Sequence, residues 1–333
     1  MGIHTRGAAE PGKRSICIST ITRNRPFMLQ NLLQSYAAMG VPRDVGLHFL
    51  IVENNEKATL HDVIAQFRAL VPQWTVQYEV EPRLGIARAR NHALACALTG
   101  NHDLMTFADD DERVEPDWLI ELLAELDASR LDIVGSPVRA APISANAPFS
   151  AQLVWAGLNR RGMESERKAR RRCQRNEAHR ILLATGSWMG RLSFFDRTGL
   201  RFDDTLDLAG GEDWRLYRDA KKLGARTGWT PHAIAYETVP MDRLTLSYHF
   251  RRDRDSSSVE TCRKLDQRRA LTLLRIPGSL AIRVVKLCSY AAAAPFTRGE
   301  ALVRLAACMG SIFGICQGCL GKRSSHYRRT SGF

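Results

Sequence analysis

The sequence predicts an α/β fold whose central sheet is mainly parallel and flanked by helices. Short apolar segments rich in β-branched residues alternate with longer segments whose apolar positions recur at helical spacing, which is the pattern of successive βαβ units. The chain has 333 residues, enough for one large α/β domain with an appendage or for two ordinary domains. In open sheets of this kind, ligands collect at the carboxyl ends of the strands, so polar residues at those ends are candidates for function.

The first two strands are predicted at residues 16–21 and 47–52, each an apolar run that ends in polar residues. Between them, residues 27–39 place apolar side chains at helical spacing, and Gly40 is a stop signal for that helix. The second strand runs directly into residues 53–55, which read Glu-Asn-Asn.

The next predicted elements continue the alternation. Residues 60–70 show a helical pattern, residues 74–80 alternate as a strand does, and residues 85–98 form an Ala-rich helical segment. A fourth strand at residues 104–108 ends in three consecutive aspartates, and residues 116–126 are again helical by pattern.

The pattern weakens between residues 137 and 179, where we expect a loop-like start followed by a basic surface loop. Order returns over residues 181–195. A later helix is expected after the sequence Gly-Gly-Glu-Asp at residues 210–213, with Gly224 as its end.

Charge is unevenly distributed along the chain. Its 48 Lys and Arg residues exceed its 35 Asp and Glu residues, which gives a formal net charge of +13. Residues 251–333 carry 16 basic and 5 acidic side chains, and residues 156–180 carry 9 basic and 3 acidic ones, so the remainder is slightly acidic. This asymmetry indicates an ordinary enzyme domain with an appendage for an anionic partner, such as a phosphate, a nucleotide, a nucleic acid or a lipid headgroup.

Two apolar segments, residues 279–296 and 301–320, lie in that basic C-terminal region. Each is interrupted by cations, Arg283 and Lys286 in the first and Arg304 in the second. A central Arg or Lys costs about 2.5–3.5 kcal/mol on membrane-insertion scales, so we expect helices in the headgroup plane of an anionic membrane rather than spanning helices. The alternative is a pair of helices packed on the main domain or in a dimer interface.

The sequence therefore divides into a flexible N-terminus at residues 1–14, a main domain at residues 15–258, and a basic, apolar, membrane-associating helical region at residues 259–333. Residues 1–14 lack the apolar core of a signal peptide, and the eight cysteines lack disulfide-like spacing. Cys316 and Cys319 form a C-x-x-C pair, but no second pair or nearby His completes a zinc site. We expect a cytoplasmic protein with reduced thiols, peripheral on the inner face of the cell membrane.

Three consecutive carboxylates, Asp109, Asp110 and Asp111, end the fourth predicted strand. Two unit charges about 4 Å apart repel by roughly 1 kcal/mol in water and about 4 kcal/mol at an effective dielectric of about 20. A divalent cation would remove this repulsion, and Mg²⁺ usually takes one or two carboxylates together with substrate phosphates. In an extended segment Asp109 and Asp111 point the same way and Asp110 points the opposite way. A solvated turn is the alternative for this motif.

The Gly-Gly-Glu-Asp sequence at residues 210–213 is a second candidate for chemistry. Its glycines would allow close approach of a ligand, and Asp213 at the start of the helix is a candidate general base because an aspartate is ionised at neutral pH. The alternative is an ordinary helix N-cap preceded by a glycine loop.

These motifs occur in the order and spacing of family 2 glycosyltransferases, which residues 15–255 resemble. The resemblance is carried by residues 16–26, 51–55, 85–91 (G-I-A-R-A-R-N) and 109–118, by Thr185-Gly186 and by residues 210–214. Within the family the chain is most similar to bacterial exopolysaccharide transferases of the succinoglycan β-glucosyltransferase type. The resemblance implies a GT-A fold and an inverting, metal-dependent transfer from a nucleotide sugar, expected to be a UDP-hexose. The implied acceptor is a lipid-linked saccharide or an oligosaccharide in polysaccharide biosynthesis.

The resemblance also implies roles for individual residues. The positions that match donor-binding positions of the family are Thr22, Arg23, Glu53, Arg90, Asn91, Asp109, Asp110, Arg251, Arg252 and Arg254. Asp111, together with Asp109, matches the position that binds Mg²⁺ or Mn²⁺. Asp213 matches the catalytic base, with Glu212 and Gly211 beside it at the acceptor.

Two positions depart from the family pattern. Glu53 stands where the family usually has Asp, and Tyr236 precedes a Glu where relatives often have His, so either His232 substitutes for that His or the role is absent. Trp188 and Trp214 flank the expected acceptor side and are candidates to stack on a sugar ring, with packing in the core as the alternative.

Two other functions are weighed against the glycosyltransferase. A sugar-1-phosphate nucleotidyltransferase shares the nucleotide-binding core, but residues 19–26 contain no glycine, and such enzymes usually carry a Gly-rich, basic signature there. A basic nucleic-acid-binding protein would account for the net charge and for the Arg-rich residues 167–175, but that run lacks interleaved aromatic residues. We therefore expect no nucleic-acid partner.

Overall fold

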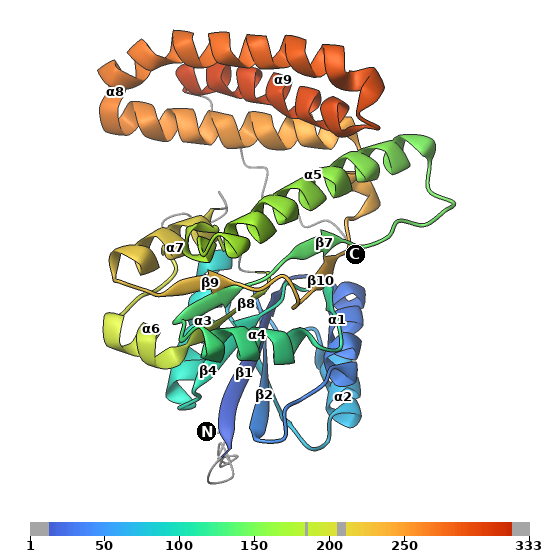
Figure 1. Cartoon of the computed structure of the whole chain (residues 1–333), viewed down its shortest axis with the longest axis vertical. Coiled ribbons are helices and arrows are strands. Elements are labelled where there is room, and N and C mark those ends of the chain that lie inside the picture. Colours follow the sequence, from blue (N-terminus) through green and yellow to red (C-terminus); the bar gives the residue numbers. More distant parts are fainter. Residues whose placement is uncertain (1–12, 184–185, 205–210, 322–333) are drawn as a thin grey trace. The chain divides into compact units, whose positions relative to one another are not determined.

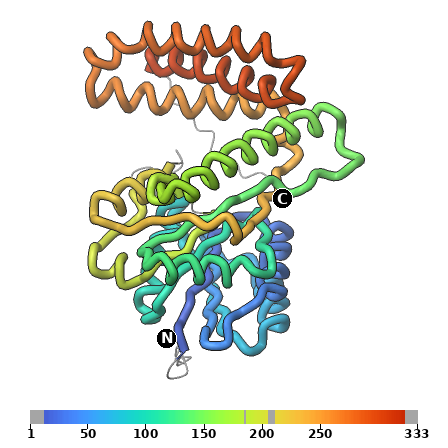
Figure 2. Tube along the Cα trace, in the orientation of Figure 1, coloured from blue at the N-terminus to red at the C-terminus, as the bar shows by residue number. Residues whose placement is uncertain are grey.

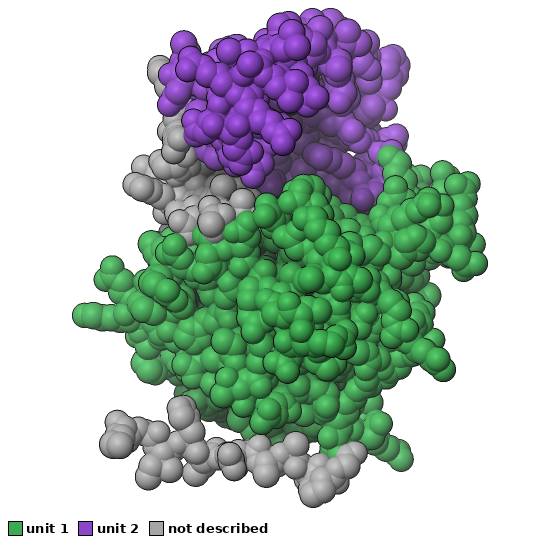
Figure 3. Space-filling model, turned by 90° about the vertical axis from the view of Figure 1, so that its left-hand side faces the viewer, with its two compact units in different colours: residues 1–139, 166–238, 333 green, residues 140–165, 239–332 purple. Residues whose placement is uncertain are grey.

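The structure, a computed structural model, describes residues 13–183, 186–204 and 211–321. The chain forms two compact units (Figure 3). Of the described residues, the first unit contains 13–139, 166–183, 186–204 and 211–238, and the second contains 140–165 and 239–321. The predicted domain boundary at residue 258 falls inside helix α8 (Leu246–Ala293), and that division stays a prediction.

A seven-stranded sheet forms the centre of the first unit (Figure 1). Its strands are β1 Arg14–Thr22, β2 Val45–Glu53, β3 Thr75–Val80, β4 Leu104–Phe107, β6 Ile133–Gly135, β8 Trp188–Arg191 and β9 Thr227–Trp229. They lie in the order β3-β2-β1-β4-β8-β6-β9, and only β8 runs antiparallel to its neighbours. The mainly parallel sheet predicted from the alternating pattern is therefore confirmed.

A second, three-stranded sheet has the order β5-β10-β7. Its strands are β5 Glu112–Val114, β7 Val138–Ala140 and β10 Ala235–Glu237. Because β5 begins at Glu112, directly after the three aspartates, this small sheet continues from the carboxyl end of β4.

Helices cover both faces of the main sheet (Figure 1). They are α1 Pro26–Ala38, α2 His61–Leu70, α3 Ile86–Thr99, α4 Trp118–Ala128, α6 Leu192–Thr198 and α7 Glu212–Lys222, with a 3₁₀ turn at Ala178–Arg180. Successive side chains of a strand point to opposite faces, so Ile16 and Ile18 of β1 join the core formed with α1, α2 and α4, whereas Cys17 joins the core formed with α3, α6 and α7.

Residues 149–174 form a long helix, α5 (Phe149–Gln174), where the sequence analysis expected a basic loop. That expectation is wrong because Ala, Arg, Glu, Lys and Met are strong helix formers even without an apolar stripe. Glu166 further stabilises the helix, since it accepts from Arg170 one turn later at 2.8 Å and from Arg139 at 2.8 Å.

The second unit contains two long helices, α8 and α9 (Glu300–Cys319), with 3₁₀ turns at Met241–Arg243 and Ala294–Phe296. The backbone of Arg268 leaves helical geometry (φ −150°, ψ 66°), and α8 folds back on itself there (Figure 2). The two apolar C-terminal segments are thus helical, as expected. By length and composition alone, α9 also meets the requirement for a membrane span, with a mean hydropathy of 1.5, although a third of that window is buried within the structure.

Three glycines let α9 approach α8 at the level of the backbone. A Cβ on Gly310 would lie 2.1 Å from the carbonyl oxygen of Phe250, and one on Gly314 would lie 2.1 Å from that of Arg254. A Cβ on Gly318, four residues further on, would lie 2.6 Å from Cβ of Thr261 in α8. Small residues at this spacing allow close helix packing, a signal in the sequence that the analysis above did not use.

Candidate active site

The carboxyl ends of β1, β2 and β4 carry the three polar segments identified in the sequence. β1 lies between β2 and β4 and is parallel to both. Thr22 at the end of β1 donates from Oγ1 to Oδ2 of Asp110 at 2.7 Å, and the amide of Asn54 donates to the carbonyl oxygen of Thr22 at 2.9 Å. The prediction that these strand ends share one edge is confirmed.

The three aspartates lie in a tight turn rather than in an extended segment. The amide of Glu112 donates to the carbonyl oxygen of Asp109 at 3.0 Å, and Oε2 of Glu112 accepts from the amide of Asp109 at 3.1 Å. Because the chain turns here, Asp110 and Asp111 both contact Arg25, while Asp109 contacts a different arginine. The expected alternation of the three side chains is wrong for this reason.

Arg25 was not identified from the sequence as a site residue. Its Nη1 lies 2.8 Å from Oδ1 of Asp110 and 3.1 Å from Oδ2 of Asp111. The arginine stands directly before Pro26 at the start of α1, where the sequence analysis treated it only as the end of a strand. One cation against two carboxylates leaves the turn with excess negative charge.

Arg90 of α3 joins the two acidic segments of the sequence. Its Nη2 donates to Oδ1 of Asp109 at 2.9 Å, and its Nη1 donates to Oε1 of Glu212 at 2.6 Å. Arg90 is only 4% exposed and Glu212 only 7%, so this is a buried, charge-assisted contact. Burial by itself would lower the pKa of Arg90, but the negative charges of Asp109, Glu212 and Asp213 outweigh this effect and raise the pKa.

The start of α7 presents the second group of predicted residues. Gly211 precedes the helix with φ +88° and has open space around its Cβ position, so backbone conformation rather than close approach requires glycine there. Asp213 is partly exposed and accepts from the amide of Trp214 at 2.6 Å. Trp214 is 48% exposed, and the guanidinium carbon of Arg218 lies 4.5 Å from the centre of its ring. Gly210 lies outside the described residues.

Negative charge accumulates around the aspartate turn. Burial and the like charges of Asp110, Glu237 and Asp109 raise the pKa of Asp111 to about 8. Burial, with the charges of Asp109 and Asp111, raises the pKa of Glu112 well above its ordinary value. A bound divalent cation would favour the ionised carboxylates, so these residues fit the metal that the resemblance implies.

The protein would share such a metal with its substrate. Within residues 13–183, 186–204 and 211–321, no group of three or more His, Cys, Asp or Glu side chains is placed to hold a metal ion. Mg²⁺ sites often consist of one or two carboxylates plus phosphate oxygens and water, and Asp111 with Asp109 can supply that contribution.

Gly186 and Trp188 lie on the segment that enters β8. A Cβ on Gly186 would lie 2.2 Å from Oε1 of Glu112, so any larger residue here would require the buried Glu112 carboxylate to move. Trp188 is 2% exposed and stacks on Phe107 with ring centres 5.5 Å apart. Its burial leaves no ring face for a sugar, and its placement corresponds to the core packing weighed above. Thr185 lies outside the described residues.

The side chain of Glu53, which was predicted to contact the donor nucleotide, forms hydrogen bonds within the protein. Glu53 is buried, and its two carboxylate oxygens accept from Asn55, from the hydroxyl and amide of Thr59, and from Tyr78. Burial alone would raise the pKa of Glu53, but these hydrogen bonds outweigh it and lower the pKa. Both oxygens are therefore occupied in stabilising the turn that follows β2.

Asn91 holds the segment that follows α6. Its Nδ2 donates to the carbonyl oxygen of Phe202 at 2.9 Å and to Oδ1 of Asp204 at 2.6 Å, and its Oδ1 accepts from the amide of Phe202 at 2.8 Å. These hydrogen bonds show that Asn91 stabilises the fold of the first unit. Its predicted contact with the donor stays a prediction.

The remaining predicted residues divide between the units. Arg23 follows β1 in the first unit, whereas the predicted donor-binding arginines of α8 belong to the second unit: Arg251, Arg252 and Arg254. Tyr236 in β10 donates to Oε1 of Glu115 at 2.9 Å, and His232 is exposed. The substitution of His232 for the family His stays a prediction.

The mainly parallel sheet with helices on both faces is the α/β architecture expected of a GT-A fold. The chain belongs to glycosyl transferase family 2, whose family model matches residues 15–199. This membership confirms the resemblance described from the sequence. It favours the glycosyltransferase over the nucleotidyltransferase and the nucleic-acid-binding protein.

The chain is also similar to individual proteins. Over 242 residues the chain is 29% identical to the succinoglycan biosynthesis protein ExoM of Rhizobium meliloti (strain 1021), a match that covers 70% of each protein. Among solved structures, S. aureus TarS is similar at 16% identity with a TM-score of 0.48, over 73% of this chain and 39% of TarS. A TarS structure of residues 1–349 in complex with UDP-GlcNAc matches at 15% identity and a TM-score of 0.48, over 73% of this chain and 65% of that one. The chain thus spans less than two thirds of both TarS chains.

Proposed function

We propose that this glycosyltransferase moves a sugar from a nucleotide sugar, a UDP-hexose, to a lipid-linked or oligosaccharide acceptor in polysaccharide biosynthesis. The similarity to a protein named for succinoglycan biosynthesis supports the pathway class. The proposed transfer inverts the configuration at the anomeric carbon, in a single displacement without a covalent sugar–enzyme intermediate.

The observation that carries this proposal is the double contact of Arg90. It joins Asp109 in the proposed donor site to Glu212, the neighbour of the proposed base Asp213. A single displacement requires a base at the acceptor hydroxyl and a stabilised leaving group at the donor, within reach of one sugar. The contacts of Arg90 with Asp109 and Glu212, all in the first unit, support an arrangement of this kind.

Asp213 is the proposed catalytic base. Its carboxylate would take the proton of the attacking acceptor hydroxyl, and its partial exposure at the first turn of α7 leaves it accessible. Glu212 is held by Arg90 and therefore positions the start of α7. Trp214, exposed beside the proposed base, is the proposed stacking surface for an acceptor sugar.

The proposed donor site lies around the aspartate turn. Members of the family generally use divalent metal ions, and here Asp111 with Asp109 would hold Mg²⁺ or Mn²⁺. When bound, such an ion stabilises the negative charge of the departing diphosphate. The buried Nε of Arg23 has no hydrogen-bond partner among the described residues, which supports a contact with a polar ligand. Thr22 and Asp110 are the further proposed donor contacts in the first unit, and donor binding by Arg251, Arg252 and Arg254 of the second unit stays a prediction.

The proposed location is the cytoplasmic side of the cell membrane, with the second unit in peripheral contact with anionic lipid. Large apolar side chains on α8 and on the turn after it are exposed, among them Leu274, Val285 and Phe296. Cations such as Arg275 and Arg298 lie among or beside them in the sequence and are exposed too. Apolar side chains interspersed with cations are typical of helices that lie in a membrane interface.

The test is a donor screen with the full-length protein. Purified protein is incubated with a panel of nucleotide sugars and Mg²⁺ or Mn²⁺, and the release of nucleoside diphosphate is measured. We expect Asp213→Asn to lower turnover by roughly 10²–10⁴-fold while donor binding persists. Asp219→Asn is the matched control because Asp219 lies on the same helix and pairs with Arg215 and Lys222 instead.

Two results would contradict the proposal. Unchanged turnover in Asp213→Asn would remove this residue from the mechanism. Full activity of the wild-type protein after treatment with a chelator would contradict the assignment of Asp111 and Asp109 to a metal.

A further inference from the structure

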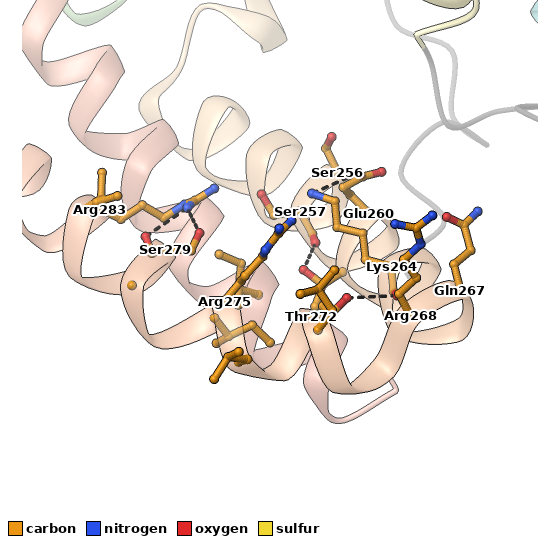
Figure 4. A pocket seen from close by; sticks show the side chains of 17 residues that line it. Ser256, Ser257, Glu260, Lys264, Gln267, Arg268, Thr272, Arg275, Ser279 and Arg283 are labelled. Carbon is orange, nitrogen blue, oxygen red and sulfur yellow. Dashed lines mark hydrogen bonds and ion pairs between the residues drawn. The ribbon is translucent and has the colours of Figure 1, made fainter.

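A pocket of about 770 Å³ lies in the second unit between the two arms of α8 and the facing side of α9 (Figure 4). The first arm contributes residues from Ser256 to Gln267, the second contributes residues from Leu271 to Arg283, and α9 contributes Ile315. The pocket therefore exists because α8 folds back at Arg268.

The polar lining of this pocket is strongly basic. Four cations line it, Lys264, Arg268, Arg275 and Arg283, against the single carboxylate of Glu260. Lys264 pairs with Glu260 at 3.2 Å. Arg283 donates to the hydroxyls of Ser279 and Ser311.

Two of these cations have no ion-pair partner among the described residues. Among the residues that the structure describes, neither Arg268 nor Arg275 forms an ion pair or a side-chain hydrogen bond. Arg268 lies at the turn of α8 and Arg275 on its second arm, and Figure 4 labels both, with Lys264, among the side chains that line the pocket. Hydroxyl groups of Ser256 and Thr272 add further polar atoms to the lining. This combination suits an anionic group with several acceptor oxygens, such as a phosphate.

The remaining lining is aliphatic and open to solvent. Leu274 is 78% exposed, and Leu271 and Ile282 are exposed as well. Exposed aliphatic side chains beside unpaired cations fit a ligand that has both a charged head and a long apolar chain. No aromatic side chain is among the described residues that line the pocket, and stacking of nucleic-acid bases relies on such side chains.

We propose that this pocket binds one phosphate-bearing anionic lipid, with its phosphate at Arg268 and Arg275 and its hydrocarbon chain along Leu271, Leu274 and Ile282. The inference rests on the proposed membrane association of the second unit and adds to it a defined lipid site. It does not depend on sugar transfer, because the binding is measured without a donor.

The experiment measures lipid retained by the full-length protein in a neutral detergent, by native mass spectrometry. Phosphatidylglycerol and a polyprenyl diphosphate are the two anionic lipids, phosphatidylcholine is the zwitterionic lipid, and inorganic pyrophosphate is the soluble anion. We expect one anionic lipid per chain, and weak binding of phosphatidylcholine and of pyrophosphate. The lipid retained at the lower concentration identifies which phosphate headgroup the pocket prefers.

Matched variants separate a pocket from a diffuse basic surface. Each Arg near a lipid phosphate contributes roughly fivefold to the affinity for the lipid. R268Q/R275Q should therefore bind anionic lipid on the order of 25-fold more weakly. R269Q/K286Q removes two cations from the same arm that do not line the pocket, and it should change binding by less than about twofold. Leu274→Asn should weaken lipid binding more than Leu273→Asn, because Leu273 lies outside the lining.

Three outcomes would overturn the proposal. Equal losses in the two double variants would mean that binding follows net charge alone. Pyrophosphate binding as tight as lipid binding, or equal effects of the two Leu variants, would mean that the hydrocarbon chain is not recognised. Circular dichroism of each variant checks that α8 and α9 remain helical.

Discussion

Replacing Arg90 by Met tests the contact that joins the two acidic segments. The change removes two charge-assisted hydrogen bonds, to Glu212 at 2.6 Å and to Asp109 at 2.9 Å. Glu212 is 7% exposed, and leaving one partner of a buried ion pair alone costs about 3–5 kcal/mol. The side chain of Asp109 is 38% exposed, so its lost pairing adds only about 0–1 kcal/mol.

The total expected loss for Arg90→Met is about 4 kcal/mol of unfolding free energy. For a domain of this size, about 1 kcal/mol shifts the melting temperature by roughly 2–4 °C, so we expect a decrease on the order of 8–16 °C. Arg90→Lys keeps the charge, but its single ammonium group cannot replace the two guanidinium nitrogens that donate to Glu212 and to Asp109, and we expect a loss of about 2 kcal/mol. Nucleoside diphosphate release should fall in both variants because the acidic segments lose their link.

Urea unfolding followed by far-UV circular dichroism measures these changes. In the Arg90→Met background, Glu212→Gln removes the unpaired carboxylate and should restore about 1–2 kcal/mol, which a double-mutant cycle detects. Arg88→Met, two residues earlier on α3, is the control and should stay within about 0.5 kcal/mol of the wild type. Arg90→Met stability within about 1 kcal/mol of the wild type, or no coupling with Glu212, would refute the reasoning.

Gly186→Ala places a Cβ 2.2 Å from Oε1 of Glu112, so unfolding free energy should fall by about 1–3 kcal/mol; wild-type stability in urea would contradict that close contact. Gly314→Leu should separate α9 from the α8 backbone and make both helices sensitive to limited proteolysis, and unchanged resistance would argue against their close packing. Burial and the charge of His48 lower the pKa of His102 from 6.5 to about 4, so the unfolded chain binds the extra proton and stability falls as pH drops through this interval. Because the ring is only partly buried, the expected loss is about 1 kcal/mol, and His102→Gln should flatten this part of the pH profile of urea unfolding.

The periodicity of the sequence predicted most elements of the first unit. The strands that became β1, β2, β3 and β4 were identified from short β-branched runs, and their helices from apolar spacing, because both patterns record which face of an element is buried. The order of local motifs was sufficient to identify the family, since each motif lies at a strand end or helix start that the fold requires.

The same patterns failed where propensity or turn geometry, rather than burial, decides the structure. α5 carries a long basic segment without an apolar stripe, so periodicity did not reveal the helix that its residue types favour. The aspartate segment was treated as extended, but the hydrogen bonds between Asp109 and Glu112 close it into a turn. The spacing of residues along the chain does not distinguish an extended segment from a turn closed by these hydrogen bonds.

The sequence by itself determined the alternation of strands and helices, the edge at which polar residues collect, and the family, because each depends on residues that are close together in the chain. Only the tertiary structure decided which charges pair. Arg90 and Glu212 are 122 residues apart, and their contact depends on where α3 and α7 lie against the sheet. Arg25 likewise meets Asp110 only because β1 and β4 are neighbours. Partners that distant leave no periodic signal, since the position of each is set by the packing of the whole unit.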